Sequence, residues 1–275
     1  MAAVAYLFPG QGAQDPALGP AVRDSIPDLF DLAAGLIGCD PFPVCGESTR
    51  YAQPAIVLSS LALWRDIAPT ADAAAFAGHS LGELGALCAA GVLSERDAVE
   101  LAVLRGELMA RSGEERGEST MLAVLKGTPE AAAQLAADFG LFVANDNAPG
   151  QVVIAGAVDA VTQARGAARE RGLRAIELDV AGAFHTPFME GAREPFAERL
   201  AEIEFGAATV PVICGLTAQP FVNPREELAE AITAPVRWRE VMLTLHGMGM
   251  EGYVDVGPGT VLEKLVERNL AEVQA

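Results

Sequence analysis

The middle of the chain alternates strand-like and helix-like segments in an order that few folds accommodate. The strand-like apolar runs occupy residues 120–127, 141–146, 152–157 and 173–180. Helical patterns occupy residues 128–140 and 158–172, and the first has Thr128 at its cap, Pro129 at its first position and Gly140 beyond its end. The order strand-helix-strand-strand-helix-strand is the ferredoxin-like arrangement. We therefore predict a ferredoxin-like subdomain at residues 115–180.

The segments on either side of this subdomain predict a larger α/β unit. Short apolar runs without polar alternation, typical of buried parallel strands, occupy residues 4–8, 73–78, 209–215 and 251–257. Helical stretches separate these runs. A chain of 275 residues with 51% hydrophobic content can bury a core of that size. We expect residues 1–114 and 181–275 to form this core, with the subdomain inserted into it.

Charge and hydropathy narrow the classes of partner. The formal net charge is -18, and a chain this acidic is a poor ligand for nucleic acids and anionic membranes, which are polyanions. No apolar run reaches the length of a membrane span. The N-terminus lacks the basic region of a signal peptide. We therefore expect a cytoplasmic protein that binds neither nucleic acid nor membrane.

Cysteine and histidine spacing argues against disulfides and metals. Four cysteines are scattered without metal-ligand spacing: Cys39, Cys45, Cys88 and Cys214. Reduced thiols are the favoured interpretation. The three histidines form no pair at the spacing of one helical turn. We expect no zinc site.

The segment Gly78-His79-Ser80-Leu81-Gly82 fits the pattern G-x-S-x-G. This pattern places a serine on a sharp turn between a strand and a helix, where glycines remove side chains that would clash. A predicted helix follows, so its N-terminal N–H groups lie near the serine, and Leu81 N–H is the natural first oxyanion donor. Ser80 is therefore a candidate nucleophile. The alternative is a serine that merely caps the helix.

A nucleophilic serine needs a base, and the chain offers three histidines. We expect the His79 ring to leave the turn in another direction and pack against the neighbouring strand. His246 lies near a predicted helix end, where solvent exposure is the default. His185 lies in a loop with Phe184 and Phe188, which would partly bury the ring and keep it neutral, as a base requires. The alternative for His185 is a structural histidine bonded to a backbone carbonyl.

Residues 94–112 form a predicted helix that carries a cation on its apolar face. Ser94 and Asp97 make a start that resembles a capping box. Arg105 stands on the apolar stripe of Ala98, Leu101, Ala102, Leu108 and Met109. A substrate carboxylate is an attractive partner, because arginine binds carboxylates with two parallel hydrogen bonds. Periodicity alone favours the alternative, a structural salt bridge to a distant acidic residue.

Together these motifs resemble the malonyl-CoA:acyl-carrier-protein transacylases of fatty acid and polyketide synthesis. Segments similar to that family's landmarks follow in the family's order: LFPGQGAQ (7–14), TRYAQPAI (49–56), GHSLGE (78–83), RGELM (105–109), VANDNAPGQVVIAG (143–156), GAFHTPFM (182–189), APVRW (234–238) and VGPGTVLEKL (256–265). One such motif is a weak signal, whereas eight in order are a strong one. The resemblance implies a hydrolase-like parallel-sheet core with an inserted ferredoxin-like subdomain.

The resemblance also implies roles for individual residues. Ser80 becomes the nucleophile that accepts the acyl group, and His185 becomes its base. Arg105 becomes the group that binds the free carboxylate of malonate. Gln11 supplies a second oxyanion N–H beside that of Leu81. The implied reaction moves a malonyl group from malonyl-CoA to the thiol of an acyl carrier protein and needs no cofactor.

The chain departs from the family's pattern in two places. The segment between GQGAQ and AQPA is shorter than usual, and alanine stands at position 231, where the family often has glutamine. In the family a backbone carbonyl at that position orients the histidine. A carbonyl survives the change to Ala231, so the change bears on local geometry more than on activity.

Other functions stay open at this point. A serine hydrolase or thioesterase would use the same Ser80 and His185, and a malonyl transferase of a malonate-decarboxylating system would use all of these residues. A non-catalytic acyl-CoA-binding module and a dinucleotide-binding protein are further alternatives. We expect a monomer. A candidate docking face for an acidic carrier protein is the arginine cluster Arg165, Arg169, Arg171 and Arg174.

Overall fold

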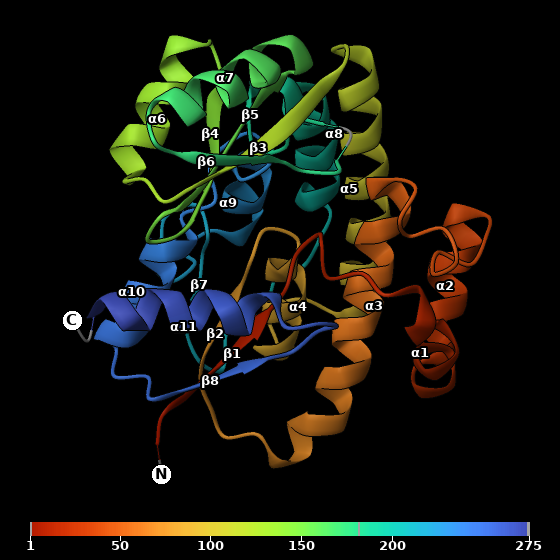
Figure 1. Ribbon diagram of the computed structural model, residues 1–275. Coiled ribbons are helices and arrows are strands. Elements are labelled where there is room, and N and C mark those ends of the chain that lie inside the picture. The colour runs from red at the N-terminus through yellow and green to blue at the C-terminus, as the bar shows by residue number, and fades with distance from the viewer. Residues whose placement is uncertain (1, 181, 274–275) are drawn as a thin grey trace.

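The computed structural model describes residues 2–180 and 182–273, so the predicted boundary at residue 181 lies outside the described residues. Two separate four-stranded sheets organise the chain (Figure 1). The first contains β1 (Val4–Phe8), β2 (Ala73–Gly78), β7 (Val212–Ile213) and β8 (Gly252–Asp255). The second contains β3 (Ser119–Leu125), β4 (Phe142–Ala148), β5 (Gln151–Ala157) and β6 (Arg174–Glu177).

The first sheet is parallel, with the order β7-β2-β1-β8, and helices cover both of its faces (Figure 1). Its helices are α1 (Gly19–Ser25), α2 (Pro27–Ile37), α3 (Thr49–Ile67), α4 (Gly82–Ala89), α5 (Glu95–Glu115), α8 (Glu190–Ala201), α9 (Pro224–Glu230), α10 (Trp238–Gly247) and α11 (Val261–Val273). Successive residues of β1 point to opposite faces of the sheet. Phe8 packs against the helices of one face, including α3 and α4, whereas Leu7 packs against α10 and α11 on the other. Helices on both faces explain why these strands read as continuous apolar runs.

The second sheet is antiparallel, with the order β4-β5-β3-β6, and helices α6 (Pro129–Asp138) and α7 (Val158–Glu170) cover one face. Leu122 and Val124 of β3 face these helices, whereas Met121 and Ala123 face the larger core. This is the predicted ferredoxin-like arrangement, and the α/β fold with a parallel-sheet core and a separate antiparallel subdomain is confirmed.

The predicted strands differ from the structure mainly at their ends. The run 209–215 contributes only Val212–Ile213 to the sheet, and 173–180 contributes only Arg174–Glu177. Both stand at the end of the strand order of their sheet. Residues 128–140 form the predicted helix with Thr128 as its cap, but the helix ends at Asp138.

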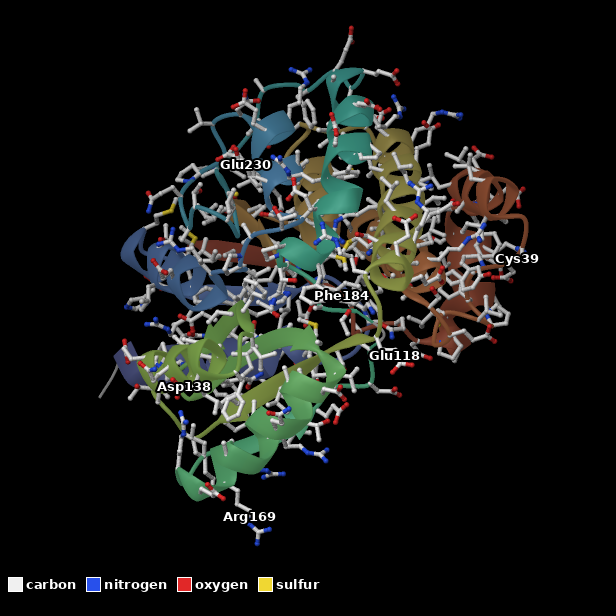
Figure 2. The ribbon with its side chains drawn as sticks, turned by 90° about the horizontal axis from the view of Figure 1, so that it is seen from above. Cys39, Glu118, Asp138, Arg169, Phe184 and Glu230 are labelled. Atoms are coloured by element: carbon white, nitrogen blue, oxygen red, sulfur yellow. The ribbon has the colours of Figure 1, made fainter. Side chains whose placement is uncertain are left out.

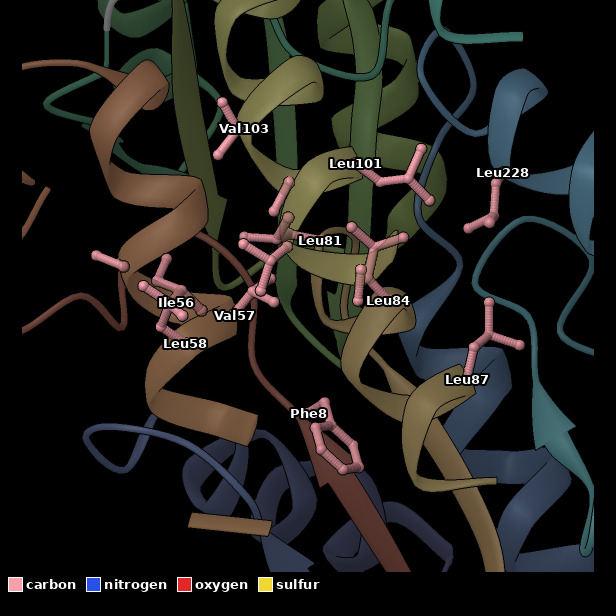
Figure 3. Packing of buried hydrophobic residues seen from close by; sticks show 14 of the residues in the cluster. Phe8, Ile56, Val57, Leu58, Leu81, Leu84, Leu87, Leu101, Val103 and Leu228 are labelled. Carbon is pink, nitrogen blue, oxygen red and sulfur yellow. The ribbon is translucent and has the colours of Figure 1, made fainter. Parts of the chain in front are cut away.

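Helix α4 is held in place by apolar packing against β1, α3 and α5 (Figure 3). Leu81, Leu84 and Leu87 are buried among side chains of α3, α5 and β1, including Ile56, Leu101 and Phe8. Close-packed interiors resist displacement, because every shift loses contacts or creates overlap. The turn between β2 and α4 is therefore rigidly positioned at the carboxyl end of the parallel sheet.

Strand β4 connects the small subdomain to the segment before α10. Asn145 forms a parallel bridge with Val236, Val236 N–H donates to Ala144 O at 2.9 Å, and Asp146 N–H donates to Val236 O at 2.9 Å. The Asp146 carboxylate accepts from Arg239 of α10, with a shortest distance of 2.7 Å. These contacts fix the small subdomain over the carboxyl end of the parallel sheet.

Among the residues that the structure describes, no helix is long and apolar enough to cross a membrane.

Candidate active site

Ser80 lies at the tip of the sharp turn between β2 and α4, in the left-handed region with φ 53°. A Cβ atom at Gly78 would lie 2.1 Å from Glu83 N, and one at Gly82 would lie 2.0 Å from Phe8 O, so both glycines are required. A non-glycine residue in this conformation carries backbone strain that the surrounding packing must hold, a common feature of functional sites. The G-x-S-x-G pattern thus has the strand, turn and helix that its chemistry needs.

His185 lies beside Ser80, although 105 residues separate them in sequence. Its Nε2 is 2.7 Å from Ser80 Oγ, and its Nδ1 is 2.8 Å from Ala231 O. A carbonyl only accepts, so Nδ1 carries the proton and Nε2 is free to accept from the serine hydroxyl. Burial, followed by the charge of Arg105, lowers the pKa of His185 to about 3, so the ring is neutral at physiological pH.

Arg105 reaches the same point from α5 and is only 6% exposed. Its Nη1 donates to Gln53 Oε1 at 2.9 Å, and its Nη2 donates to Ser80 Oγ at 3.1 Å. Within the described part of the chain, no carboxylate lies within ion-pair distance of the guanidinium, so the alternative of a structural salt bridge finds no partner. Burial lowers the pKa of Arg105 to about 10, which leaves it charged. A buried cation that no carboxylate of the described residues contacts directly points to a ligand carboxylate.

Gln11 and Leu81 bring two backbone N–H groups to the site. Both residues line the cavity beside Ser80. Over residues 2–180 and 182–273, no protein atom accepts a hydrogen bond from either N–H. The Gln11 side chain is held by Thr49, whose hydroxyl donates to Gln11 Oε1 at 2.7 Å. Two donors left free beside a serine are what an oxyanion site requires.

His79 leaves the turn in another direction, as its sequence position suggests. Its Nε2 lies 2.8 Å from Asn147 Oδ1 of β4, and its ring packs edge-on against Trp238 of α10. The ring therefore contacts the strand of the small subdomain rather than the serine hydroxyl. His246 is exposed near the end of α10.

A cavity of about 620 Å³ opens between the two sheets and contains the groups described above. Its floor is formed by Ser80, His185 and Arg105, and one wall is formed by Met121 and Val153 of the small subdomain. The volume is within the range of small-molecule sites. No cluster of three potential ligands for a metal ion occurs among the described residues.

The arginine cluster of the small subdomain lies on a different surface. Arg165, Arg169 and Arg174 line a shallow groove of about 460 Å³ over α7 and β6. In Figure 2, Arg169 stands at the outer end of the subdomain, away from Phe184 of the catalytic cavity. Arg171 does not line the groove, and it pairs with Asp138 at 2.7 Å.

Three residues that had no expected role come to the site in the structure. Gln53 fixes Arg105, Asn147 fixes His79, and the buried Glu83 follows Ser80 on α4. All three lie inside the quoted motifs, and that position was the only signal for them. Their partners are 22 to 68 residues away or are backbone atoms, so spacing could not identify them.

Comparisons with known proteins point in one direction. A family model described as "Acyl transferase domain" matches residues 46–275. The chain is 37% identical to "Polyketide biosynthesis protein ThaF" of Burkholderia thailandensis, over 98% of this chain but only 24% of that longer protein. It is 36% identical to the "Malonyl CoA-acyl carrier protein transacylase" of Bacillus subtilis, over 98% of this chain and 90% of that protein.

A solved structure agrees with the sequence comparisons. The crystal structure of malonyl CoA-acyl carrier protein transacylase from Burkholderia pseudomallei superposes with a TM-score of 0.91, at 29% identity, over 99% of both chains. The likeness thus extends over both sheets.

Proposed function

Because the chain belongs to the malonyl-CoA–acyl carrier protein transacylases of the acyl transferase family, we propose that it moves a malonyl group from CoA to a carrier thiol through an ester on Ser80. The observation that carries the proposal is that two groups from distant segments, a ring nitrogen and a guanidinium nitrogen, lie within hydrogen-bond distance of the Ser80 hydroxyl oxygen. Ser80 Oγ lies 2.7 Å from His185 Nε2 and 3.1 Å from Arg105 Nη2.

The first half-reaction begins with the attack of Ser80 Oγ on the thioester carbonyl. His185 Nε2 accepts the hydroxyl proton, and the Ala231 carbonyl stabilises the imidazolium that forms through Nδ1–H. The N–H groups of Leu81 and Gln11 bind the oxyanion, an interaction worth roughly 3–4 kcal/mol per donor. The C–S bond then breaks, and His185 returns its proton to the leaving CoA sulfur.

The second half-reaction is the reverse of the first with another thiol. His185 removes the proton from the carrier's phosphopantetheine thiol, the sulfur attacks the Ser80 ester, and the serine oxygen leaves with the proton. Thioester, ester and thioester lie close in energy, so the residues at the cavity floor account for every step.

Arg105 explains a preference for malonyl over acetyl groups. Once Ser80 Oγ is acylated, the Nη2 group that it had bound is free for the malonyl carboxylate. An acetyl group would leave this buried charge unpaired. Gln53 holds the guanidinium by accepting a hydrogen bond from Nη1.

The test is intact-protein mass spectrometry after brief incubation with malonyl-CoA. We expect an increment of one malonyl group that is absent in Ser80→Ala and is removed by holo carrier protein. Acetyl-CoA serves as the matched acyl donor and should give a smaller increment. Release of CoA with no increment would indicate hydrolysis instead, and neither increment nor release would leave a binding module.

Three further properties belong to the same proposal. We place the enzyme in the cytoplasm, in keeping with its four free cysteines. We propose a monomer, which light scattering would test. The groove of Arg165, Arg169 and Arg174 stays the candidate docking face for the acidic carrier. Charge reversal at Arg169 should raise the KM for the carrier and leave that for malonyl-CoA unchanged.

A further inference from the structure

Glu83 is a buried carboxyl group for which acyl transfer has no direct use. It lies in the first turn of α4, three residues after Ser80, and is 2% exposed. Its Oε1 accepts a hydrogen bond from Gly215 N–H at 2.7 Å. Burying a carboxyl group is costly, so its presence beneath the nucleophile needs a physical reason.

The charged and titratable groups around Glu83 come from three other segments. Arg105 approaches from α5, the thiol of Cys214 from the segment after β7, and Glu227 from α9. Arg105 is the only cation among them, and Glu83 is in turn the acidic group that acts on Arg105. The two do not form an ion pair within 4.0 Å. The N–H groups of the guanidinium are therefore available to other partners, while the charge of Glu83 still acts on it electrostatically.

The ionisation of Glu83 is finely balanced. Burial raises the pKa of Glu83 to about 7, while the Gly215 N–H and the charge of Arg105 act in the opposite direction. A ligand carboxylate on Arg105 would cancel the positive charge that favours the ionised form of Glu83. The same ligand would add a negative charge in a poorly screened interior. Both effects favour the protonated form of Glu83.

We propose that Glu83 is a positioning residue that acts through Arg105 and takes up a proton from solvent when a malonyl group is loaded, so that acyl selectivity depends on pH. The inference rests on the proposed malonyl transfer. With Glu83 protonated, the site has a net positive charge and attracts the malonyl carboxylate. With Glu83 ionised, the two charges of the protein offset each other and the attraction is weaker. Acetyl groups carry no charge and serve as the reference.

The test is the ratio of the rate constants for malonyl and acetyl loading of Ser80 between pH 6 and pH 8. The CoA part is common to both donors, and His185 is neutral throughout, so their effects cancel in the ratio. We expect the wild-type ratio to fall about three- to tenfold as pH rises. Glu83→Gln keeps the acceptor for Gly215 N–H without the charge, so its ratio should stay at the acid value.

Asp255→Asn is the matched control. Asp255 is another carboxyl group whose pKa is raised to about 7 by burial, but it accepts from Leu262 N–H and Arg105 is not among the groups that act on it. This variant should keep the wild-type fall of the ratio. A wild-type ratio that does not change with pH, or a fall that persists in Glu83→Gln, would overturn the inference.

Proton uptake by the wild-type protein gives a second measurement that needs no variant. In weakly buffered solution near pH 7.5, malonyl loading should take up a fraction of a proton per Ser80 ester, in excess of acetyl loading. Equal uptake with both donors would also overturn the inference. Failure of the proposed function is recognised separately, because no malonyl ester would then form on Ser80 at any pH.

Discussion

Two arginines near the junction of the two sheets have opposite surroundings. Arg239 of α10 meets the Asp146 carboxylate of β4 at 2.7 Å and holds the small subdomain on the core. Arg105 of α5 is more deeply buried, yet it meets an amide and a hydroxyl and no carboxylate within ion-pair distance in the described residues. A cation that stabilises the fold is paired with a carboxylate of the protein itself. A cation kept for a substrate has polar neighbours that hold its orientation, and no carboxylate of the described residues contacts it directly.

Arg105→Ala should have the largest effect of the variants considered. We expect malonyl loading of Ser80 to fall about 100- to 1000-fold, because a buried charge pair with the substrate is lost. Acetyl loading should change less than about tenfold, since it makes no such pair. Rapid-quench mass spectrometry of the Ser80 ester measures both. Equal losses for the two donors would mean that Arg105 acts on the serine and not on the carboxylate.

The neutral, buried state of His185 makes the free energy of unfolding depend on pH. Its pKa is about 3 in the folded protein and near 6.5 in the unfolded chain, so below pH 6.5 only the unfolded chain takes up this proton. Full stability is therefore present above pH 6.5 and is lost as pH falls toward 3. The share of this loss due to His185 is about 2 kcal/mol between pH 7 and pH 5. The buried carboxyl groups of Glu83 and Asp255 have raised pKa values and act in the opposite direction over the same range. Urea unfolding of the wild type and of His185→Asn at the two pH values measures the His185 share as the difference between the two proteins.

Arg239→Met tests whether Arg239 stabilises the fold without contributing to acyl selectivity. We expect the free energy of unfolding to fall by about 1–2 kcal/mol, because the partly buried Asp146 loses a charged partner. The ratio of malonyl to acetyl loading should match that of the wild type. Denaturant unfolding and the Ser80 loading assay check the two halves of this prediction. A change in the loading ratio would show that Arg239 also serves the site.

The smallest effect concerns backbone strain outside the site. Lys126 is exposed and adopts φ 65°, close to the value of Ser80. Lys126→Gly should raise the free energy of unfolding by about 0.5–1 kcal/mol, because glycine adopts this conformation without steric cost. Thermal unfolding would detect it. The strain at Ser80 cannot be relieved in this way without removing the nucleophile.

Local patterns predicted the parts of the fold that local physics determines. The cap at Thr128, the glycines around Ser80 and the apolar stripe that carries Arg105 each depend on neighbours within a few residues. The short edge strand Val212–Ile213 was overestimated because pairing, and not hydropathy, decides where a strand ends.

The candidate site was predictable in its members and not in its contacts. The roles of Ser80 and His185 followed from residue type and family resemblance. The contact of Gln53 with Arg105 and that of Asn147 with His79 join residues 52 and 68 positions apart. Such pairs arise from how α3 packs on α5 and how β4 approaches the core. Those arrangements are tertiary, so a pattern along the chain does not contain them.

Successive side chains of β3 point to opposite faces of the sheet, so one set serves packing and the other lines the cavity. Leu122 and Val124 belong to the core under α6 and α7, whereas Met121 faces the cavity together with Val153 of β5. Substitutions at the second set reshape the chamber around the acyl group without disturbing the packing of the first. The wall of the chamber can therefore diverge toward bulkier acyl groups while the core under α6 and α7 stays intact, although Met121 and Val153 also pack in the larger core.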